Sequence, residues 1–211
     1  QWKTTVGEML LTGVGSRPAD SMIQHQTVVA LTRLADPVPL QKILERDRKA
    51  GEVNLQRIGF QGDLHVRRRV ALIALDQMDN SPLTSAMVTP LLATDDPTLQ
   101  RTALEVLARH PGWGKEALGT IREWLQEPNL SPEKLGAIRT LLVAQANEDE
   151  VQKLIAESLN GREDASVGAM LWEVVQRADV VGWPAGWNGL LQQALTMGDP
   201  QHQLVALRII Q

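Results

Sequence analysis

The stretch Asp63-Leu-His-Val-Arg-Arg-Arg-Val-Ala-Leu72 decides the fold, because a similar pattern returns twice further along the chain. The recurrences are Asp96-Pro-Thr-Leu-Gln-Arg-Thr-Ala-Leu104 and Asp199-Pro-Gln-His-Gln-Leu-Val-Ala-Leu207. In each stretch, an Asp that can cap a helix N-terminus precedes apolar residues at helical spacing. The sequence therefore predicts a series of Asp-capped helices of one kind.

These helices return with a regular period. The capping residues Asp63, Asp96, Ser131, Asp164 and Asp199 are separated by 33, 35, 33 and 35 residues. A period in this range is the signature of stacked helical hairpins. The second helices of the hairpins are predicted at about Ser81 to Ala93, Lys115 to Gln126, Glu148 to Leu159 and Asn188 to Met197. The prediction is an all-α fold, a right-handed α-solenoid of about five to six hairpins.

We expect a single repeat domain over residues 1–211, with irregular repeats in 1–62 and regular ones in 63–211. In the irregular part, helices are predicted from Asp20 to Leu34 and from about Val38 to Lys49, and Gly51 to Gly62 reads as a connector or one short helix. The apolar run from Leu204 to Ile210 contrasts with the polar capping repeat that normally ends a solenoid. The chain therefore looks like an excerpt from a longer protein.

The form Asp-Pro-x-Leu/Val-x-x-x-Ala-Leu resembles HEAT repeats, and most closely the short variety found in phycobilin lyases. This resemblance implies that the Asp-capped helix lines a concave face and that the helix before it lies on the convex face. The family often has Arg one residue after the Val or Leu. Here that residue is Arg67 in one repeat but Gln100 and Gln203 in two others, so an Asp–Arg ladder would be broken.

A narrower resemblance covers about residues 60 to 126. Arg67 to Asp76, together with Leu104 to Trp113, looks like HEAT segments of large multidomain planctomycete proteins. Those proteins commonly join a dehydrogenase-like β-propeller to a haem-binding cytochrome domain. This chain has no CxxCH motif, so the resemblance implies no redox role for it. A periplasmic location would follow from this resemblance; otherwise the compartment stays open.

Composition excludes several classes of site. The 211 residues contain no Cys, which rules out a disulfide framework, a thiolate metal site, a Cys nucleophile and c-type haem attachment. The net charge of −4 argues against a general nucleic-acid binder, which usually carries a basic stripe. No apolar run is long enough to span a bilayer.

The densest charge cluster is Arg67-Arg68-Arg69. From Gln41 to Arg69 there are eight Lys and Arg against four Asp and Glu, a local charge of +4. The cluster reads either as a patch for an acidic partner or as solvated Arg68 and Arg69 with Arg67 paired to a neighbouring Asp. The loop Gly182-Trp-Pro-Ala-Gly-Trp187 offers two Trp that could be exposed at an interface or could pack against a neighbour. The possible partner-binding residues are Arg68, Arg69, Arg101, Glu105, Glu173, Arg177, Trp183 and Trp187.

Catalytic motifs are missing from the sequence. The residues His25, His65, His110 and His202 lack the four-residue spacing of a helical zinc site. No Walker loop and no Gly-x-Ser-x-Gly elbow occurs, so we expect no catalytic residue, metal, cofactor or small-molecule substrate. The predicted function is a non-catalytic interaction or spacer module that presents a concave surface to a protein partner or to another domain of its parent chain. The alternative is a HEAT-like enzyme, such as a DNA glycosylase or a lyase, acting at that face.

Overall fold

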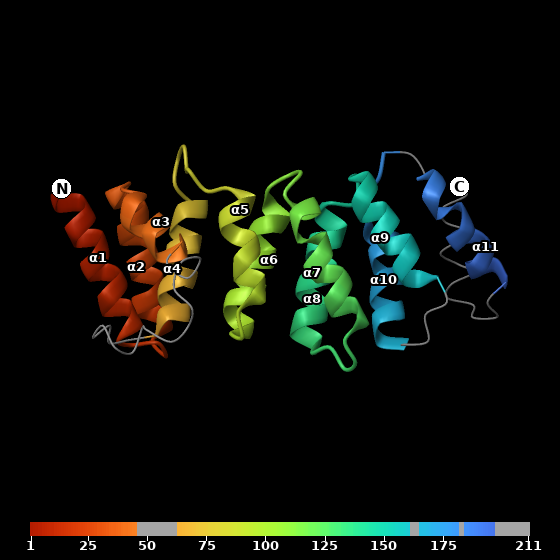
Figure 1. The fold of residues 1–211 in the computed structure, drawn as a ribbon, viewed down its shortest axis with the longest axis horizontal. Helices are drawn as coiled ribbons and strands as arrows, with labels where there is room; N and C mark the ends of the chain where they lie inside the picture. The colour runs from red at the N-terminus through yellow and green to blue at the C-terminus, as the bar shows by residue number, and fades with distance from the viewer. Residues whose placement is uncertain (46–62, 161–164, 182–183, 197–211) are drawn as a thin grey trace. The chain divides into compact units, whose positions relative to one another are not determined.

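The computed structural model describes residues 1–45, 63–160, 165–181 and 184–196 (Figure 1). Regular structure in these residues is helical, and they contain no strand. The predicted all-α class is therefore confirmed. Gly51 to Gly62, Asp164 and Asp199 lie outside the described residues, so their predicted roles stay predictions.

The chain forms two compact units, Gln1–Val106 and Leu107–Gln211, and the boundary between them falls within one helix, α6 (Pro97–Arg109). The first unit contains α1 (Trp2–Gly15), α2 (Ser21–Leu34), α3 (Val38–Glu45), α4 (Leu64–Asp76), α5 (Ser85–Val88) and the 3-10 helix η4 (Thr89–Ala93). The second contains α7 (Gly114–Gln126), α8 (Pro132–Ala144), α9 (Asp149–Leu159), α10 (Ala165–Arg177), the 3-10 helix η5 (Ala185–Trp187) and α11 (Asn188–Thr196).

Side-chain caps begin several helices, as the sequence predicts. An oxygen of the capping side chain accepts a backbone hydrogen bond at Asp20 before α2, Asp63 before α4, Asp96 before α6 and Ser131 before α8. Each cap satisfies N–H groups that have no partner inside the helix. The predicted caps at Asp63, Asp96 and Ser131 are thus confirmed.

The predicted second helix of the Asp63 hairpin begins later than expected. Ser81 does not start a helix; its Oγ accepts a hydrogen bond from the Leu83 N–H in a local turn. The short helix α5 starts at Ser85 and continues as η4. Pro90 lies in η4, where its missing N–H cannot contribute to an α-helical ladder. Pro90 therefore limits the α-helical part of this segment, which is shorter than the predicted second helices α7 and α9.

Helix α4 is the centre of the first unit, because α1, α2 and α3 all pack against it (Figure 1). Its apolar residues Val70, Ala71, Leu72, Ala74 and Leu75 are buried. Helix α1 also packs against α2 and α3. A helix covered by three neighbours buries much more than one apolar stripe. Polar residues on α4 are therefore buried as well as apolar ones.

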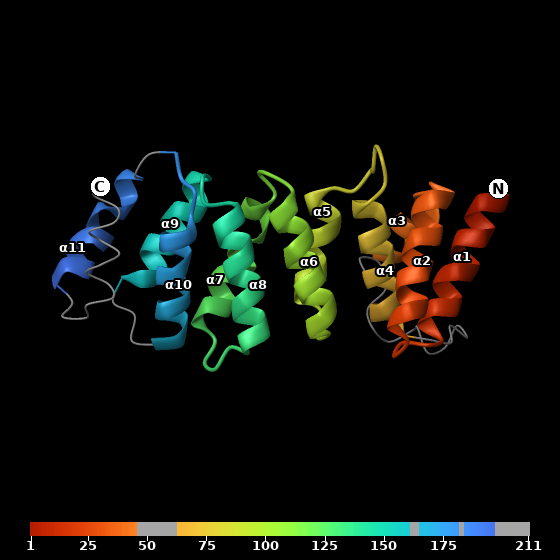
Figure 2. The ribbon, with the colours of Figure 1, turned by 180° about the vertical axis from the view of Figure 1, so that it is seen from behind.

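In the second unit, α7 packs against α9, and α8 packs against α10. Figures 1 and 2 show α7 and α9 on one side of this unit and α8 and α10 on the other. Fully buried Ile121 and Leu154 come from the first pair of helices, and Ile138 and Leu171 come from the second. In both of these pairs, a helix thus packs against the next helix but one along the chain.

Gln145, in the turn after α8, joins this turn to the end of α6. Its side chain is 3% exposed, and its Nε2 donates to the carbonyl oxygens of Leu107 at 3.3 Å and His110 at 3.0 Å. Its Oε1 accepts from the Gly112 N–H at 3.0 Å. The last carbonyls of a helix have no partner within the helix, so one amide supplies what the end of α6 lacks.

Asn147, two residues further on, makes the same kind of connection to the following turn. Its Nδ2 donates to the Asp179 carbonyl and its Oδ1 accepts from the Val181 N–H, both at 2.9 Å. The α8–α9 turn therefore holds the backbone on both of its sides, reaching back with Gln145 and forward with Asn147.

Polar contacts between distant elements repeatedly span about one sequence period. The Gln145 and Asn147 bonds join positions 32 to 38 residues apart. Others with separations of 32 to 35 residues are Thr4–Asp36, Lys42–Glu8, Arg122–Glu157, Arg139–Glu173 and Trp187–Gln152. The bond from Arg69 to Gln24 spans 45 residues and lies in the less regular N-terminal part. The period read from the caps thus reappears in the tertiary contacts.

We expect Gln145→Ala to lower the free energy of unfolding by about 1–3 kcal/mol, because it leaves buried backbone groups unsatisfied. The matched control is Gln126→Ala, a truncation of an exposed Gln at the end of α7, which should change stability by less than about 0.5 kcal/mol. Urea unfolding followed by circular dichroism measures both. Equal effects of the two substitutions would show that the Gln145 amide contributes no more to stability than an exposed Gln does.

Candidate interaction sites

The Arg67-Arg68-Arg69 cluster is largely buried within the first unit. Arg67 is 2% exposed and Arg68 is 6% exposed, while Arg69 is half-buried and its Nη2 donates to Oε1 of Gln24. Burial lowers the pKa of the Arg68 guanidinium below its ordinary value, because desolvation disfavours the charged form. The expectation that Arg68 is solvated is wrong, since α4 is covered by three helices. Arg68 therefore does not contribute an exposed patch for a partner.

Arg67 lies against the C-terminal end of α1, where only a glycine leaves room for it. A Cβ on Gly15 would lie 2.2 Å from Arg67 Nε. The Gly15 carbonyl also accepts a hydrogen bond from the Asp63 N–H at 2.7 Å, which ties the end of α1 to the start of α4. Carbonyl groups at a helix C-terminus carry partial negative charge, which favours a cation placed beside them.

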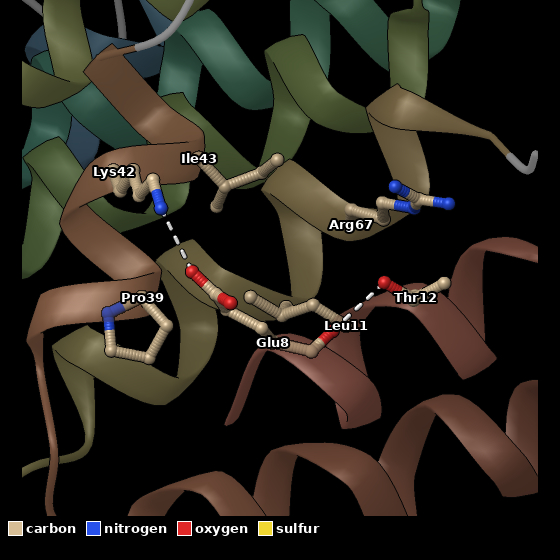
Figure 3. Close-up of a pocket in the computed structure, with 7 residues that line it drawn as sticks. All are labelled: Glu8, Leu11, Thr12, Pro39, Lys42, Ile43 and Arg67. Carbon is tan, nitrogen blue, oxygen red and sulfur yellow. Dashed lines mark hydrogen bonds and ion pairs between the residues drawn. The ribbon is translucent and has the colours of Figure 1, made fainter. Parts of the chain in front are cut away.

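A pocket of about 210 Å³ opens beside Arg67, between α1, α3 and α4 (Figure 3). The residues that line it are Glu8, Leu11, Thr12, Pro39, Lys42, Ile43 and Arg67. In Figure 3, Arg67 and Thr12 lie at one end and the Lys42–Glu8 ion pair lies towards the other, with Leu11 and Ile43 between them. The Nζ–Oε1 distance of this ion pair is 2.8 Å. The pocket thus has an apolar middle, with Arg67 at one end and an ion pair at the other.

The second unit brings two of the predicted partner-binding residues together on α10. The carboxylate of Glu173 is shared by two guanidinium groups: Arg177 on the same helix, at 2.7 Å, and Arg139 on α8, at 2.6 Å. The Arg177 side chain is 62% exposed and the Arg139 side chain is 36% exposed. Arg139 is not among the residues predicted from the sequence, although its opposite charge 34 positions before Glu173 is a readable signal.

Arg101 and Glu105 lie on α6 within the first unit. Their side chains are about half exposed, and the Nε–Oε1 distance between them is 3.7 Å. An exposed ion pair at this helical spacing stabilises the fold by at most about 0.5 kcal/mol. These two residues are accessible, as partner binding would require, but they belong to no larger polar cluster among the contacts described for this unit.

The two Trp of the Gly182–Trp187 loop have different outcomes. Trp187 is 0% exposed, and its Nε1 donates to the Gln152 carbonyl on α9 at 3.0 Å. Of the two readings of this loop, packing against a neighbour is confirmed for Trp187, and exposure at an interface is excluded, because η5 and α9 pack together and enclose the indole. Trp183 lies outside the described residues. Trp124 and Trp172 are buried, and each is 6% exposed.

The described residues contain no group of three or more His, Asp or Glu side chains placed to hold a metal ion. Among the helices that the structure describes, none has the length and the apolar character needed to cross a membrane. Comparison with known proteins finds no matching family model, no matching curated protein and no matching solved structure.

We expect Gly15→Ala to destabilise the chain by about 1–3 kcal/mol, because the new Cβ and the buried Arg67 side chain cannot both keep their places. Gly13→Ala is the matched control on the same helix. A Cβ there meets no atom within 4 Å, so this substitution should stabilise by about 0.4–1 kcal/mol. Urea unfolding of the two variants measures the difference, and a stabilising Gly15→Ala would contradict the close approach of Arg67.

Proposed function

We propose that this chain is a HEAT-like α-solenoid that acts as a non-catalytic interaction module and binds a protein partner on the face formed by α8 and α10. The observation that carries the solenoid is the length of the polar contacts, which join residues 32 to 38 positions apart in the second unit. In a stack of repeats, each repeat contacts mainly its neighbours, so its contacts should span one period. The packing of α7 on α9 and of α8 on α10 supports the same arrangement.

The α8–α10 face supports the binding role because it presents charged groups that are held in place. Arg139, Glu173 and Arg177 form a cluster of net charge +1 on a chain of net charge −4. The shared carboxylate fixes both guanidinium groups, and each still has further N–H donors for an acidic partner. Fixing the side chains in advance reduces the entropy lost on binding. The HEAT resemblance places the Asp-capped helices, which include α10 in the predicted series, on the concave face.

A test of the solenoid removes one whole period. Deleting residues 131–163 takes out 33 residues and joins Leu130 to Asp164, which replaces one predicted cap by the next. The shortened chain should stay folded and lose helical circular dichroism in proportion to the residues removed, because the remaining repeats keep equivalent neighbours. Cooperative urea unfolding of the shortened chain is the second readout.

The control for this deletion removes half a period and so breaks the register. Removing residues 140–156 takes out 17 residues and joins the middle of α8 to the end of α9. It should abolish cooperative unfolding. If the in-register deletion behaves like this control, the repeat architecture is contradicted.

A test of the binding role changes charges on one face only. In affinity capture from the organism that produces the chain, we expect Arg139→Ser with Arg177→Ser to reduce recovery of a specific partner by about tenfold or more, the loss typical of charge-assisted hydrogen bonds. The control is Arg122→Ser, which breaks the comparable Arg122–Glu157 pair of 2.9 Å between α7 and α9. Equal loss in both variants, or recovery of no specific partner at all, would contradict binding at the α8–α10 face.

A further inference from the structure

We infer that helix α1 packs against α1 of a second copy of this chain, and that the two helices run antiparallel about a two-fold axis. The contact is made by the α1 stripe, which consists of Trp2, Val6, Met9 and Gly13. This inference goes beyond the proposed function and is independent of it, because α1 belongs to the first unit and the α8–α10 face belongs to the second.

The α1 stripe is an exposed apolar row on a helix at the edge of the first unit. In Figures 1 and 2, α1 lies at this edge, and α2, α3 and α4 pack against it. The exposed fractions of Trp2, Val6 and Met9 are 67%, 36% and 68%, and Gly13 is exposed as well. Their spacings of four, three and four residues are those of a seam between two packed helices. An exposed apolar row marks an interaction site, and Trp and Met are enriched in interfaces.

No charged residue interrupts the α1 stripe. The charged residues of α1 are Lys3 and Glu8. Since successive residues of an α-helix are about 100° apart, each of them lies about 90° or more around the helix from the middle of the stripe. Glu8 is also paired with Lys42 of α3, at 2.8 Å. Two copies of the stripe can therefore meet without bringing like charges together and without desolvating an ion.

The order of the residues makes the α1 stripe complementary to itself. When two copies of α1 run antiparallel, a two-fold axis between positions 6 and 9 places Val6 opposite the partner's Met9. The same axis places Trp2 opposite the partner's Gly13. A Cβ on Gly13 would meet no atom within 4 Å in one copy, so this position leaves room for an indole ring. The largest residue thus faces the smallest, and the symmetry makes each contact twice.

A parallel arrangement lacks this fit. It would place the two Trp2 side chains against each other and the two Gly13 residues against each other, which overfills one layer and leaves another empty. Parallel helices also bring like ends of their dipoles together, whereas antiparallel helices bring opposite ends together. Shape and dipoles therefore favour the same antiparallel pair, and the complementary surface that they require is a second copy of this chain.

The α1 stripe is short, so the association is weak. A contact between single helices of this length buries less than the roughly 1,200 Å² at which stable interfaces begin, and we expect a Kd above about 10 µM. At the low micromolar concentrations of an unfolding experiment, the chain is then a monomer. The stabilisation expected for Gly13→Ala therefore refers to one copy alone.

Sedimentation equilibrium of the full chain at about 5 to 500 µM tests the association. The average mass should rise from that of one chain towards that of two and stop there, because a two-fold contact closes on itself. Val6→Lys and Met9→Glu should each raise the Kd about tenfold or more, since each places a charge in the apolar centre of the contact. Val181→Lys is the matched control, because Val181 is 96% exposed and lies in the second unit. It should leave the Kd unchanged.

Combining Val6→Lys with Met9→Glu in one chain tests which residues face each other. In the antiparallel pair, the two introduced charges have opposite signs and meet across the axis twice. The double variant should therefore return to within about threefold of the Kd of the parent chain, whereas losses at positions that do not meet would add. Circular dichroism checks that each variant is folded as the parent chain is.

Cross-linking tests the orientation, because the chain contains no Cys that would interfere. A mixture of the Trp2→Cys chain and the Gly13→Cys chain should form a disulfide-linked dimer on mild oxidation, since these two positions face each other. Either chain alone should cross-link much less. In the antiparallel pair, the two copies of one such position are about 16 Å apart along the helix axis, which is too far for a disulfide.

Three results would overturn the inference. The first is a chain that stays a monomer at the highest concentration, which would assign the α1 stripe to a partner other than this chain. The second is an association that Val6→Lys weakens no more than Val181→Lys does, or that the double variant does not restore. The third is a Trp2→Cys chain that cross-links with itself in preference to the Gly13→Cys chain.

Discussion

The need to satisfy the backbone at the end of a helix shapes the second unit, and the Gln145 amide meets that need. At the end of α6, where the Gln145 side chain is buried, an unsatisfied carbonyl would be costly. The Gln145 amide supplies donors and an acceptor to the turn after α6, and the exposed Asn147 side chain makes a similar link to the turn after α10 at the surface. Gly114 allows this close approach, since a Cβ there would lie 2.8 Å from Gln145 Cγ. Side chains in the turns thus help the apolar core to hold the helices of this unit together.

The first unit meets a related constraint with charge. The end of α1 faces a guanidinium group, and Gly15 lacks the side chain that would exclude it. Burying a cation is expensive unless its surroundings compensate it, and partial charges at a helix end provide part of that compensation. The buried Arg67 side chain also lines the pocket between α1, α3 and α4. The close approach of Arg67 to Gly15 therefore holds α1 against α4 at the edge of this pocket.

Local signals in the sequence were sufficient to predict the helices and their caps. They were insufficient to predict which neighbours cover each helix. Asp63, Asp96 and Ser131 cap helices as predicted, because a cap depends on residues within one turn. The exposure expected for Arg68 was wrong, and the sequence left Trp187 open between exposure and packing, because burial depends on neighbours distant in sequence, α1 to α3 in one case and α9 in the other. Among the candidate residues, Glu173 and Arg177 were found, but Arg139, their partner on α8, was not. Opposite charges one period apart, as in Arg122 and Glu157, could have indicated such pairs.

Contacts of nearly constant sequence separation limit how such a chain can change its length in evolution. A contact between residues about 34 positions apart, such as Arg139 with Glu173, joins matching positions of adjacent repeats in the proposed solenoid, so the gain or loss of a whole period would keep matching backbone positions side by side. An insertion of a few residues within a helix would instead shift every later residue out of register with its partner. For the proposed solenoid, whole-repeat duplication is therefore the expected route of growth, and small insertions would be tolerated in the turns that carry no amide link. Chains related by such duplication would differ in length mainly by whole repeats.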